Sequence, residues 1–469
     1  MKILFVYPEI GKASVGFQQG IGSLSATLKA GGHQTSLICL TEHIEKPALM
    51  KEIIKHSPEL IAFSSTTPQY HYVEKYSSWI KEELEVPIIC GGVHATMNPD
   101  RVLSSKGIDV VCVGEGEYPL LELANRIEEG KRIDNIENLW IKNHNAIIKN
   151  PVRALITNLN ELQFPDREIF DFENLLKKMN YEAEFMAGRG CPYECSYCCN
   201  HGLKGVYRGK GTYARIRSVD NVLAEIKSVV SKYHVERIVF HDDTFTLFHD
   251  WIDEFTRKYP TEFDLPFRCN ARVETLNRQI LSKLKKAGCD MLLIGIESGN
   301  EWLRRSILNR HMTNQQITNA FRMAHEIGLK TWSFNMVGIP YETSEMAEET
   351  IELNRLIQTD IIQVSIFYPY PNTALWELCS KNGYISKNHV DSYFEDESSL
   401  NLPTMSKEQT TQLYRKFCDL AFERRLKTNY PLLFKFLQPF LRPKTTNTLR
   451  QVAESIEASP FRNLVHGTI

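Results

Sequence analysis

The chain has 469 residues, of which 42% are hydrophobic and 24% are charged, a composition typical of a globular protein with two or three domains. Its formal net charge of −2 excludes a general electrostatic attraction to nucleic acids or anionic membranes. Since the sequence shows neither a secretory signal nor about eighteen consecutive apolar residues that would span a membrane, we expect a cytoplasmic protein.

Short apolar runs alternate with segments of helical spacing in the first 140 residues. The expected strands are residues 2–7, 35–40, 60–64, 87–90 and 109–113, with helices over 21–30 and 72–84. This alternation predicts a parallel sheet wrapped by helices. Ligands of such sheets bind beyond the carboxyl ends of the strands. The candidate binding segments are therefore residues 8–19, 64–68, 91–96 and 114–117.

Two glycine-rich strings in these segments are the most informative, CGGVHATMNPD and VCVGEGEYPLLEL. They resemble the flavodoxin-like (Rossmann-type) cobalamin-binding domain that precedes the radical S-adenosylmethionine (radical SAM) core in one large subgroup of that family. The resemblance implies such a domain over residues 1–140. Its candidate cobalamin-binding residues are Ser64, Ser65, Gly91, Gly92, His94, Gly114, Glu115, Gly116 and Glu117.

One motif of many cobalamin domains is missing. We find no D-x-H-x-x-G string, whose histidine would bind cobalt, so cobalamin bound here is expected to lack that lower ligand. Glycine and small residues are also common where strands simply turn, so a flavodoxin-like domain without cobalamin is the alternative.

Residues 141–182 are expected to be a linker. Pro165 and the aspartates after it discourage regular structure, and the segment resembles the equivalent connection of the same subgroup.

The stretch EFMAGRGCPYECSYCC, residues 184–199, places Cys191, Cys195 and Cys198 at the spacing C-x-x-x-C-x-x-C. An apolar strand here leads into glycines and Pro192, which favour a loop over a helix. A loop can bring three thiolates together, and three thiolates suit an iron–sulfur cluster with one iron left open. Such a cluster and the free cysteines fit a reducing compartment.

With Tyr197 before the last cysteine, this stretch resembles the signature of the radical SAM enzymes. In that family the three cysteines hold a [4Fe-4S] cluster, and the amino and carboxylate groups of S-adenosylmethionine (SAM) chelate the open iron. A closed zinc site is the alternative and would need a fourth ligand such as Cys199 or His201. We interpret Cys199 instead as a small apolar residue beside the site.

Strand-like and helix-like runs alternate again after residue 183. The expected strands are 184–188, 237–243, 266–272, 291–297, 330–338 and 361–370, and helices over 219–233 and 278–287 lie between them. Six strand–helix units are fewer than the eight of a complete barrel. We therefore expect a partial (β/α)6 TIM-type barrel over 183–380, with its active site at the carboxyl ends of the strands.

Polar residues at these strand ends are candidates for the SAM site. They are Asp242, Asp243, Asn270, Arg272, Glu297, Ser298, Gly338 and Ile339. Adjacent carboxylates are costly unless a cation faces them. In the radical SAM family this region contacts the methionyl ammonium, so the resemblance implies that role for Asp242 or Asp243, with helix capping as the alternative for the second carboxylate. Arg272 is then expected at the methionyl carboxylate and Glu297 at the ribose. Gly338 and Ile339 resemble the family's adenine-contacting segment.

Residues 381–469 are expected to form a helical carboxyl-terminal region, with a helix over 406–427. The segment 429–442, NYPLLFKFLQPFLR, has the composition of a membrane-contacting or lipid-binding stretch. Pro431 and Pro439 interrupt any long amphipathic helix, so we favour a helical cap over the barrel.

Together these features predict an enzyme that cleaves SAM reductively to a 5′-deoxyadenosyl radical and acts on an unactivated carbon of a small-molecule or lipid-like substrate. The expected cofactors are a [4Fe-4S] cluster, SAM and cobalamin, and C-methylation is the first choice of reaction. An electron donor such as a flavodoxin or a ferredoxin is the expected partner, and no nucleic acid is expected.

Three other functions stay open. A radical SAM cyclase or rearrangement enzyme has the same layout. A methylthiotransferase would bring further amino-terminal cysteines for a second cluster, but only Cys39, Cys90 and Cys112 are available, and we interpret them as core residues. A non-catalytic cobalamin carrier or sensor would have no use for the cysteine loop.

Overall fold

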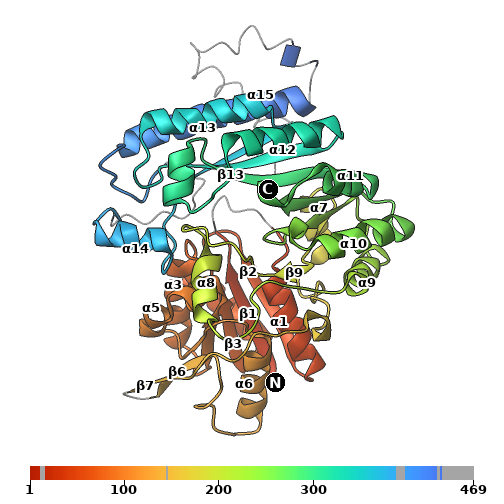
Figure 1. Ribbon diagram of the computed structural model, residues 1–469. Helices are drawn as coiled ribbons and strands as arrows, with labels where there is room; N and C mark the ends of the chain where they lie inside the picture. Colours follow the sequence, from red (N-terminus) through yellow and green to blue (C-terminus); the bar gives the residue numbers. More distant parts are fainter. Residues whose placement is uncertain (11–15, 144–145, 387–396, 430–431, 433, 436–469) are drawn as a thin grey trace. The chain divides into compact units, whose positions relative to one another are not determined.

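The computed structural model describes residues 1–10, 16–143, 146–386, 397–429, 432 and 434–435 (Figure 1). Its internal contacts divide the chain into two units. Unit 1 is Met1–Val235 with Pro369–Leu378, and unit 2 is Glu236–Tyr368 with Cys379–Ile469. The domain boundaries expected at residues 140, 182 and 380 stay predictions.

Unit 1 is built on a sheet of order β2-β1-β3-β4-β5-β6-β7. Its strands are β1 (Lys2–Pro8), β2 (Gln34–Leu40), β3 (Leu60–Ser64), β4 (Ile88–Gly91), β5 (Val110–Cys112), β6 (Leu139–Asn143) and β7 (Ala146–Lys149). The first five run parallel, in the order 2-1-3-4-5 that is typical of flavodoxin-like folds. The predicted Rossmann-type fold of the amino-terminal region is confirmed.

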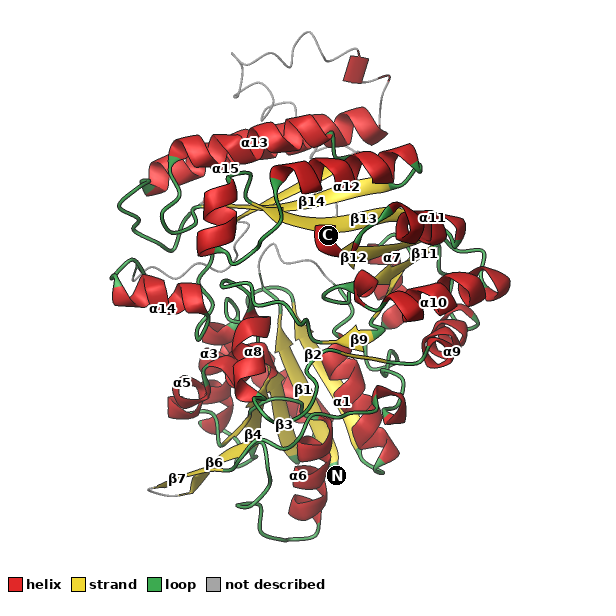
Figure 2. Ribbon diagram, viewed as in Figure 1, coloured by secondary structure: helices red, strands yellow, loops and turns green. Residues whose placement is uncertain are grey.

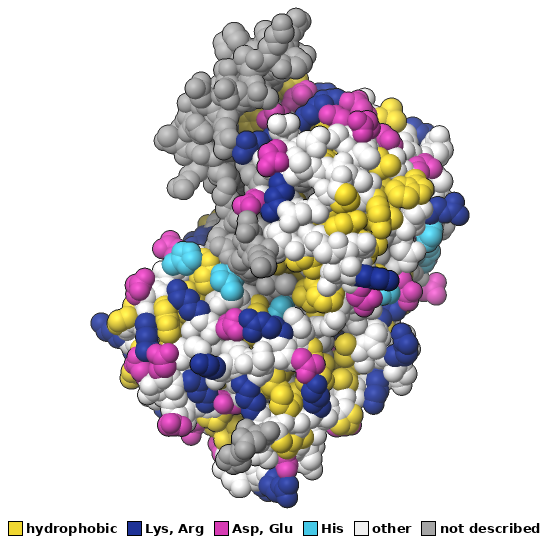
Figure 3. Space-filling model, turned by 90° about the vertical axis from the view of Figure 1, so that its left-hand side faces the viewer, with side chains coloured by type: hydrophobic (Ala, Val, Ile, Leu, Met, Phe, Trp, Pro, Cys, Tyr) yellow, Lys and Arg dark blue, Asp and Glu magenta, His cyan; other side chains and the backbone are white. Residues whose placement is uncertain are grey.

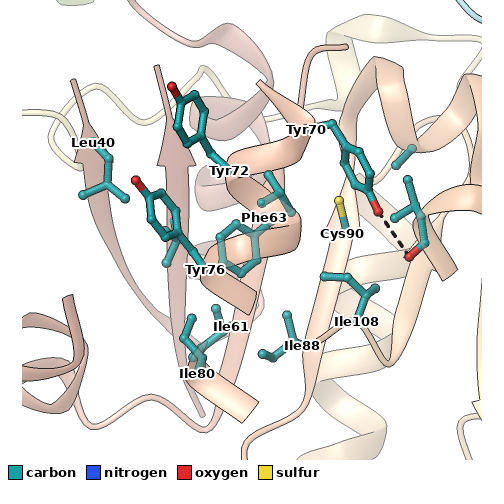
Figure 4. Close-up of a cluster of buried hydrophobic side chains, with 14 of the residues drawn as sticks. Leu40, Ile61, Phe63, Tyr70, Tyr72, Tyr76, Ile80, Ile88, Cys90 and Ile108 are labelled. Atoms are coloured by element: carbon teal, nitrogen blue, oxygen red, sulfur yellow. Dashed lines mark hydrogen bonds between the residues drawn. The ribbon is translucent and has the colours of Figure 1, made fainter. Parts of the chain in front are cut away.

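Helices alternate with these strands along the chain and cover the sheet (Figure 2). They are α1 (Gln19–Ala30), α2 (Lys46–His56), α3 (Tyr70–Lys81), α4 (Gly92–Met97), α5 (Pro99–Ser104) and α6 (Glu117–Glu128). Strand side chains alternate between the two faces. On one face Ile61 and Phe63 of β3 pack against Tyr76 and Ile80 of α3, in the main hydrophobic core of this sheet (Figure 4).

The rest of unit 1 connects the sheet to the cysteine loop. Its elements are η1 (Leu159–Glu161), α7 (Phe172–Lys178), β8 (Glu182–Phe185), β9 (Gly188–Arg189), α8 (Cys199–Val206), β10 (Arg215–Ile216) and α9 (Val219–Val230). The expectation that residues 141–182 lack regular structure is therefore wrong in part. β6 and β7 pair antiparallel along β5 and cover what would otherwise be an exposed edge of the parallel strands.

Unit 2 carries parallel strands in the order β15-β14-β13-β12-β11. Strands and helices alternate in sequence: β11 (Arg237–Phe240), η2 (Phe245–Leu247), α10 (His249–Glu262), β12 (Phe267–Ala271), η3 (Val273–Thr275), α11 (Arg278–Lys286), β13 (Cys289–Glu297), η4 (Leu303–Ile307), α12 (Asn314–Glu326), β14 (Lys330–Val337), α13 (Ser344–Ile357) and β15 (Ile361–Ile366). With β8 and α9 counted first, the chain has the six strand–helix repeats of the predicted (β/α)6 partial barrel.

Two helices follow the last strand, α14 (Ala374–Lys381) and α15 (Lys407–Asn429). The helix predicted over 406–427 is α15, and its Tyr414, Phe417 and Leu420 are buried against β15. The segment 429–442 lies largely outside the described residues. No helix of the described part combines the length and apolarity needed to cross a bilayer. Figure 3 shows basic and acidic side chains interspersed on the face in view.

Candidate functional site

A cavity of about 500 Å³ lies in unit 1 at the carboxyl ends of the parallel strands. Phe5, Ala62 and Ile89 line it from the sheet, on the face opposite the core of Figure 4, and Leu24 of α1 and Leu120 of α6 line it from the helices. Among the predicted cobalamin-binding residues, those that line it are Ser64, Gly91, Gly92, Gly114, Glu115, Gly116 and Glu117. The largely apolar cavity therefore lies where flavodoxin-like sheets bind ligands.

The glycines of the cavity wall differ in whether a side chain could replace them. Gly92 has a φ of +90°, and a Cβ there would lie 2.7 Å from the backbone nitrogen of Ser65. Gly114 has a φ of +97°, and a Cβ there would collide with the hydroxyl of Tyr207. Gly91 is extended, and its Cβ would meet only the Cβ of Cys112, at 3.7 Å. Two of these glycines are therefore required by the fold, whereas Gly91 leaves space for a ligand.

Ser65 and His94 do not line the cavity. The Ser65 amide donates to the Gly91 carbonyl at 3.1 Å, and the Ser65 carbonyl accepts the His94 amide at 3.1 Å. The His94 ring stacks on Tyr70, and its Nδ1 lies 3.1 Å from the Thr67 hydroxyl. Burial, and then the Arg101 charge, lower the pKa of His94 to about 4. His94 is therefore neutral at physiological pH and is engaged with α3 and the β3 loop.

The two acids of the G-E-G-E string are engaged by arginines that come much later in the chain. Glu117 Oε1 accepts a hydrogen bond from Arg189 at 2.6 Å and one from the Ser23 hydroxyl at 2.8 Å. Glu115 accepts hydrogen bonds from Arg189 and Arg215, each at 3.0 Å. Burial alone would raise the pKa of Glu117, but Arg189 and then Ser23 hold that pKa below its usual value. Both carboxylates therefore pair with arginines of the segment that contains the cysteine loop.

The three cysteines lie between β9 and α8. Cys191 and Cys195 are buried, and Cys198 is partly exposed at the N-cap of α8, where its amide donates to the Cys195 carbonyl at 3.1 Å. In the described residues no three His, Cys, Asp or Glu side chains are arranged to hold a single metal ion. A closed zinc site would bring all of its thiolates to one ion. An iron–sulfur cluster spaces its thiolates more widely, because each thiolate binds a different iron.

The other predicted core cysteines of unit 1 differ in their burial. Cys90 and Cys112 are buried, as expected, and Cys112 also lines the cavity. Cys39 is exposed, so its interpretation as a core residue is wrong. The reason is that β2 is the edge strand of the sheet, where alternate side chains face solvent.

The predicted SAM-site residues of β11 and β12 lie at the carboxyl ends of adjacent parallel strands in unit 2. Asp242 is buried and Asp243 is exposed. The Asn270 side chain donates to the Asp242 carbonyl at 2.9 Å. Arg272 is buried and pairs with Glu274 at 2.7 Å. The two strand ends are thus joined directly through the Asn270 amide.

Glu297 ends β13 with a φ of +69°, a conformation that non-glycine residues seldom adopt. Its carboxylate lies 3.8 Å from the Arg310 guanidinium. Ser298 follows and is fully buried, and its hydroxyl accepts the Asn300 amide at 3.2 Å. Strained backbone of this kind is retained where the surrounding structure fixes it.

Sequence reasoning missed two buried arginines that fix this turn. Arg304 donates to the Ser298 carbonyl at 2.5 Å and to the Met312 carbonyl at 2.9 Å. Arg310 donates to the Gly295 carbonyl at 2.6 Å. The signal in the sequence was the basic segment LRRSILNR, residues 303–310, which begins six residues after the end of the predicted strand at 297.

Gly338 and Ile339 follow β14, where Gly338 has a φ of +79°. Their amides donate to Glu342 Oε2 at 2.6 and 3.2 Å. Glu342 is fully buried, and its Oε1 has no hydrogen-bond partner among the described residues. Burial raises the pKa of Glu342 to about 8, although the two amides oppose the shift. The carboxyl group therefore keeps its proton at neutral pH.

This buried acid predicts a pH-dependent stability. Since the pKa of Glu342 is about 8 in the fold and 4.5 is its ordinary value, its contribution is complete below about 4.5 and is lost as the pH rises to about 8. The loss is at most about 1.4 kcal/mol per pH unit. Glu342→Gln should remove this part of the slope in urea unfolding measured across that range. Glu352→Gln, in the exposed part of α13, is the control, and equal slopes in all three proteins would contradict the prediction.

Two protein-family models match the chain. Residues 13–124 match the B12 binding domain, and residues 186–353 match the Radical SAM superfamily. The chain is a B12-binding radical SAM protein. The first match contains most of the cavity wall, and the second contains the three cysteines and the strands β11 to β14.

Named relatives of this B12-binding radical SAM protein include more than one activity. It is 28% identical to an uncharacterized methyltransferase of Pyrococcus horikoshii, over 89% of this chain and 91% of the relative. It is 24% identical to the anaerobic magnesium-protoporphyrin IX monomethyl ester cyclase of Rubrivivax gelatinosus, over 80% of this chain and 70% of the relative.

A solved structure has the same fold. It is the radical SAM methyltransferase TsrM of Kitasatospora setae with cobalamin and a [4Fe-4S] cluster bound, at 17% identity and a TM-score of 0.65 over 88% of this chain and 81% of that chain. The predicted family and fold class are confirmed. So are the predicted cofactors, a [4Fe-4S] cluster, SAM and cobalamin, which the two matched domains imply. The roles of individual site residues stay predictions.

Proposed function

We propose that this radical SAM enzyme uses cobalamin to transfer a methyl group to an unactivated carbon atom of a small molecule. One observation carries the proposal: unit 1 contains both a glycine-walled cavity at the ligand edge of a flavodoxin-like sheet and a three-cysteine loop. A carrier or sensor of cobalamin would need only the first. A radical enzyme without cobalamin would need only the second.

The residues present fit both groups. Cys191, Cys195 and Cys198 would hold the cluster, because they lie in one loop between β9 and α8 at the spacing C-x-x-x-C-x-x-C. Gly91 and Gly116 would border cobalamin, because both line the cavity without a side chain of their own. When bound, these cofactors supply a 5′-deoxyadenosyl radical and a methyl group, and the protein orients the substrate and excludes water.

The strand ends of unit 2 would bind SAM. We assign the buried Asp242 to the methionyl ammonium, in preference to the exposed Asp243, because a desolvated carboxylate needs a cation. Arg272 is assigned to the methionyl carboxylate and Glu297 to the ribose. Asn270 and Ser298 would complete this strand-end site, and the backbone of Gly338 and Ile339 would border the adenine. Tyr197, in the cysteine loop of unit 1, is proposed separately as a cofactor-binding residue.

The proposed substrate is a small molecule. A relative named as a hopanoid C-2 methylase supports this class and makes a lipid-like substrate a class to test within it. A flavodoxin or a ferredoxin is proposed as the electron donor. Cyclisation is the second candidate function, and the relative named as a cyclase favours it.

The test needs no substrate. The protein is purified anaerobically, reconstituted with iron and sulfide, reduced with dithionite, and given SAM with or without hydroxocobalamin. We expect 5′-deoxyadenosine under both conditions and S-adenosylhomocysteine, the product of methyl donation by SAM, only with hydroxocobalamin. 5′-Deoxyadenosine without S-adenosylhomocysteine would argue against methyl transfer and for cyclisation. If neither product forms, both candidate functions fail.

A further inference from the structure

The segment Gly114–Glu117 has two roles in unit 1. All four of its residues line the cavity. The same segment also contacts the chain on both sides of the cysteine loop, at Arg189 before Cys191 and at Tyr207 after α8. A ligand in the cavity and the cysteine loop would therefore both contact Gly114–Glu117.

The contact before the loop is a charge cluster. Arg189 of β9 and Arg215 of β10 are paired directly opposite each other in an antiparallel ladder. Like charges in this position destabilise a strand pair unless an anion lies between them. Glu115 is that anion, 3.0 Å from each guanidinium, and Glu117 holds the other side of Arg189 at 2.6 Å. The β9–β10 pair therefore depends on Gly114–Glu117.

A single, conformationally constrained residue separates Arg189 from Cys191, the first cysteine of the loop. Gly190 is the only intervening residue, its φ is +84°, and an added Cβ would collide with the Tyr213 carbonyl. The Tyr213 hydroxyl donates to the Asn200 side chain at 2.8 Å, and Asn200 Nδ2 lies 3.8 Å from the sulfur of Cys198. Gly190, Tyr213 and Asn200 thus form a continuous set of contacts between Arg189 and Cys198.

The contact after the loop is independent of these charges. The Glu115 amide donates to the Tyr207 hydroxyl, and Gly114 packs against the same hydroxyl. Tyr207 is the C-cap residue of α8, the helix that begins at Cys199 directly after the last of the three cysteines. Both ends of the cysteine segment are therefore attached to the same cavity-lining residues.

We infer that Gly114–Glu117 couples cobalamin binding to cluster loading, with Arg189 and Tyr207 as positioning residues. This inference rests on the proposed function. A corrinoid in the cavity restricts the segment and so favours the cluster-binding arrangement of the loop. By thermodynamic linkage, a loaded cluster must favour corrinoid binding by the same factor, and couplings of this kind are roughly 5- to 150-fold.

The experiment measures the affinity for hydroxocobalamin by anaerobic absorbance titration. It compares the cluster-loaded protein with the variant Cys191→Ala/Cys195→Ala/Cys198→Ala. We expect the loss of the cluster to weaken binding roughly 5- to 150-fold. In the background Arg189→Gln/Glu117→Gln, which removes one charge of each sign, the same comparison should give a clearly smaller ratio, because only the Tyr207 contact remains.

Two further variants make the test specific. Arg153→Gln/Glu122→Gln removes another ion pair of unit 1, at 2.9 Å, that does not line the cavity, and it should keep the full ratio. Tyr207→Phe removes the second contact without changing charge and should lower the ratio, which keeps the test decisive if the charge variant does not fold.

Two outcomes would overturn the inference, and they differ in meaning. If the wild-type chain binds hydroxocobalamin equally well with and without the cluster, the coupling is absent while the proposed function stands. If the cluster-loaded wild-type chain does not bind hydroxocobalamin at all, the coupling and the cobalamin-dependent function fail together.

Discussion

Replacing Cys191, Cys195 and Cys198 together by alanine is expected to reduce the bound iron of the reconstituted protein from about four atoms per chain to nearly none. Formation of 5′-deoxyadenosine should then fall to the background of the assay. The physical reason is that each thiolate covers a different iron, and no other group of His, Cys, Asp or Glu in the described residues is arranged to replace them. Iron, sulfide and zinc analysis checks the first result, and chromatography of the nucleoside checks the second.

Cys199→Ala is the matched control, because Cys199 directly follows the last cysteine of the trio and is partly exposed. It should keep the full iron content. Zinc bound in place of iron, and lost in Cys199→Ala as well, would contradict the cluster and support a four-ligand zinc site. About eight irons per chain in the wild-type protein would instead support the methylthiotransferase alternative.

Gly91→Leu is expected to weaken hydroxocobalamin binding roughly 5- to 150-fold while the protein remains folded. Gly91 lines the cavity, and its extended backbone accepts any side chain. The first atom of that side chain would meet only the Cβ of Cys112, at 3.7 Å, so the rest would extend into the ligand space. Forcing extra methylenes into an occupied volume costs about 1 to 3 kcal/mol, which corresponds to the stated range.

Gly91→Ala is the control for this prediction and should bind hydroxocobalamin like the wild type, since its methyl group fits against Cys112. Thermal unfolding of both variants should stay close to that of the wild type. Equal affinity of Gly91→Leu and wild type would show that cobalamin does not bind in this cavity. Gly92→Ala would be uninformative, because it would distort the backbone at Ser65.

The architecture of both sheets could be predicted from the sequence, because the signals are local. β1, β3 and β13 appear as apolar runs close to their observed bounds, since strands buried on both faces need such runs. The cysteine loop was also visible, because its spacing and its glycines are contained in sixteen consecutive residues, 184–199. The short strands β6 and β7 were not visible, because four or five residues with mixed burial do not differ clearly from a linker.

The sequence by itself thus determined the order of the parallel strands and their helices, the three-cysteine loop and the glycine-rich edge of the first sheet, because each depends on neighbouring residues. Only the tertiary structure decided what the acids of that edge contact. Glu115 was predicted to contact a cofactor, and its carboxylate is held by Arg189 and Arg215, which lie 74 and 100 residues later in the chain. The partner of a charge depends on which distant segments fold together, and no local pattern carries that information.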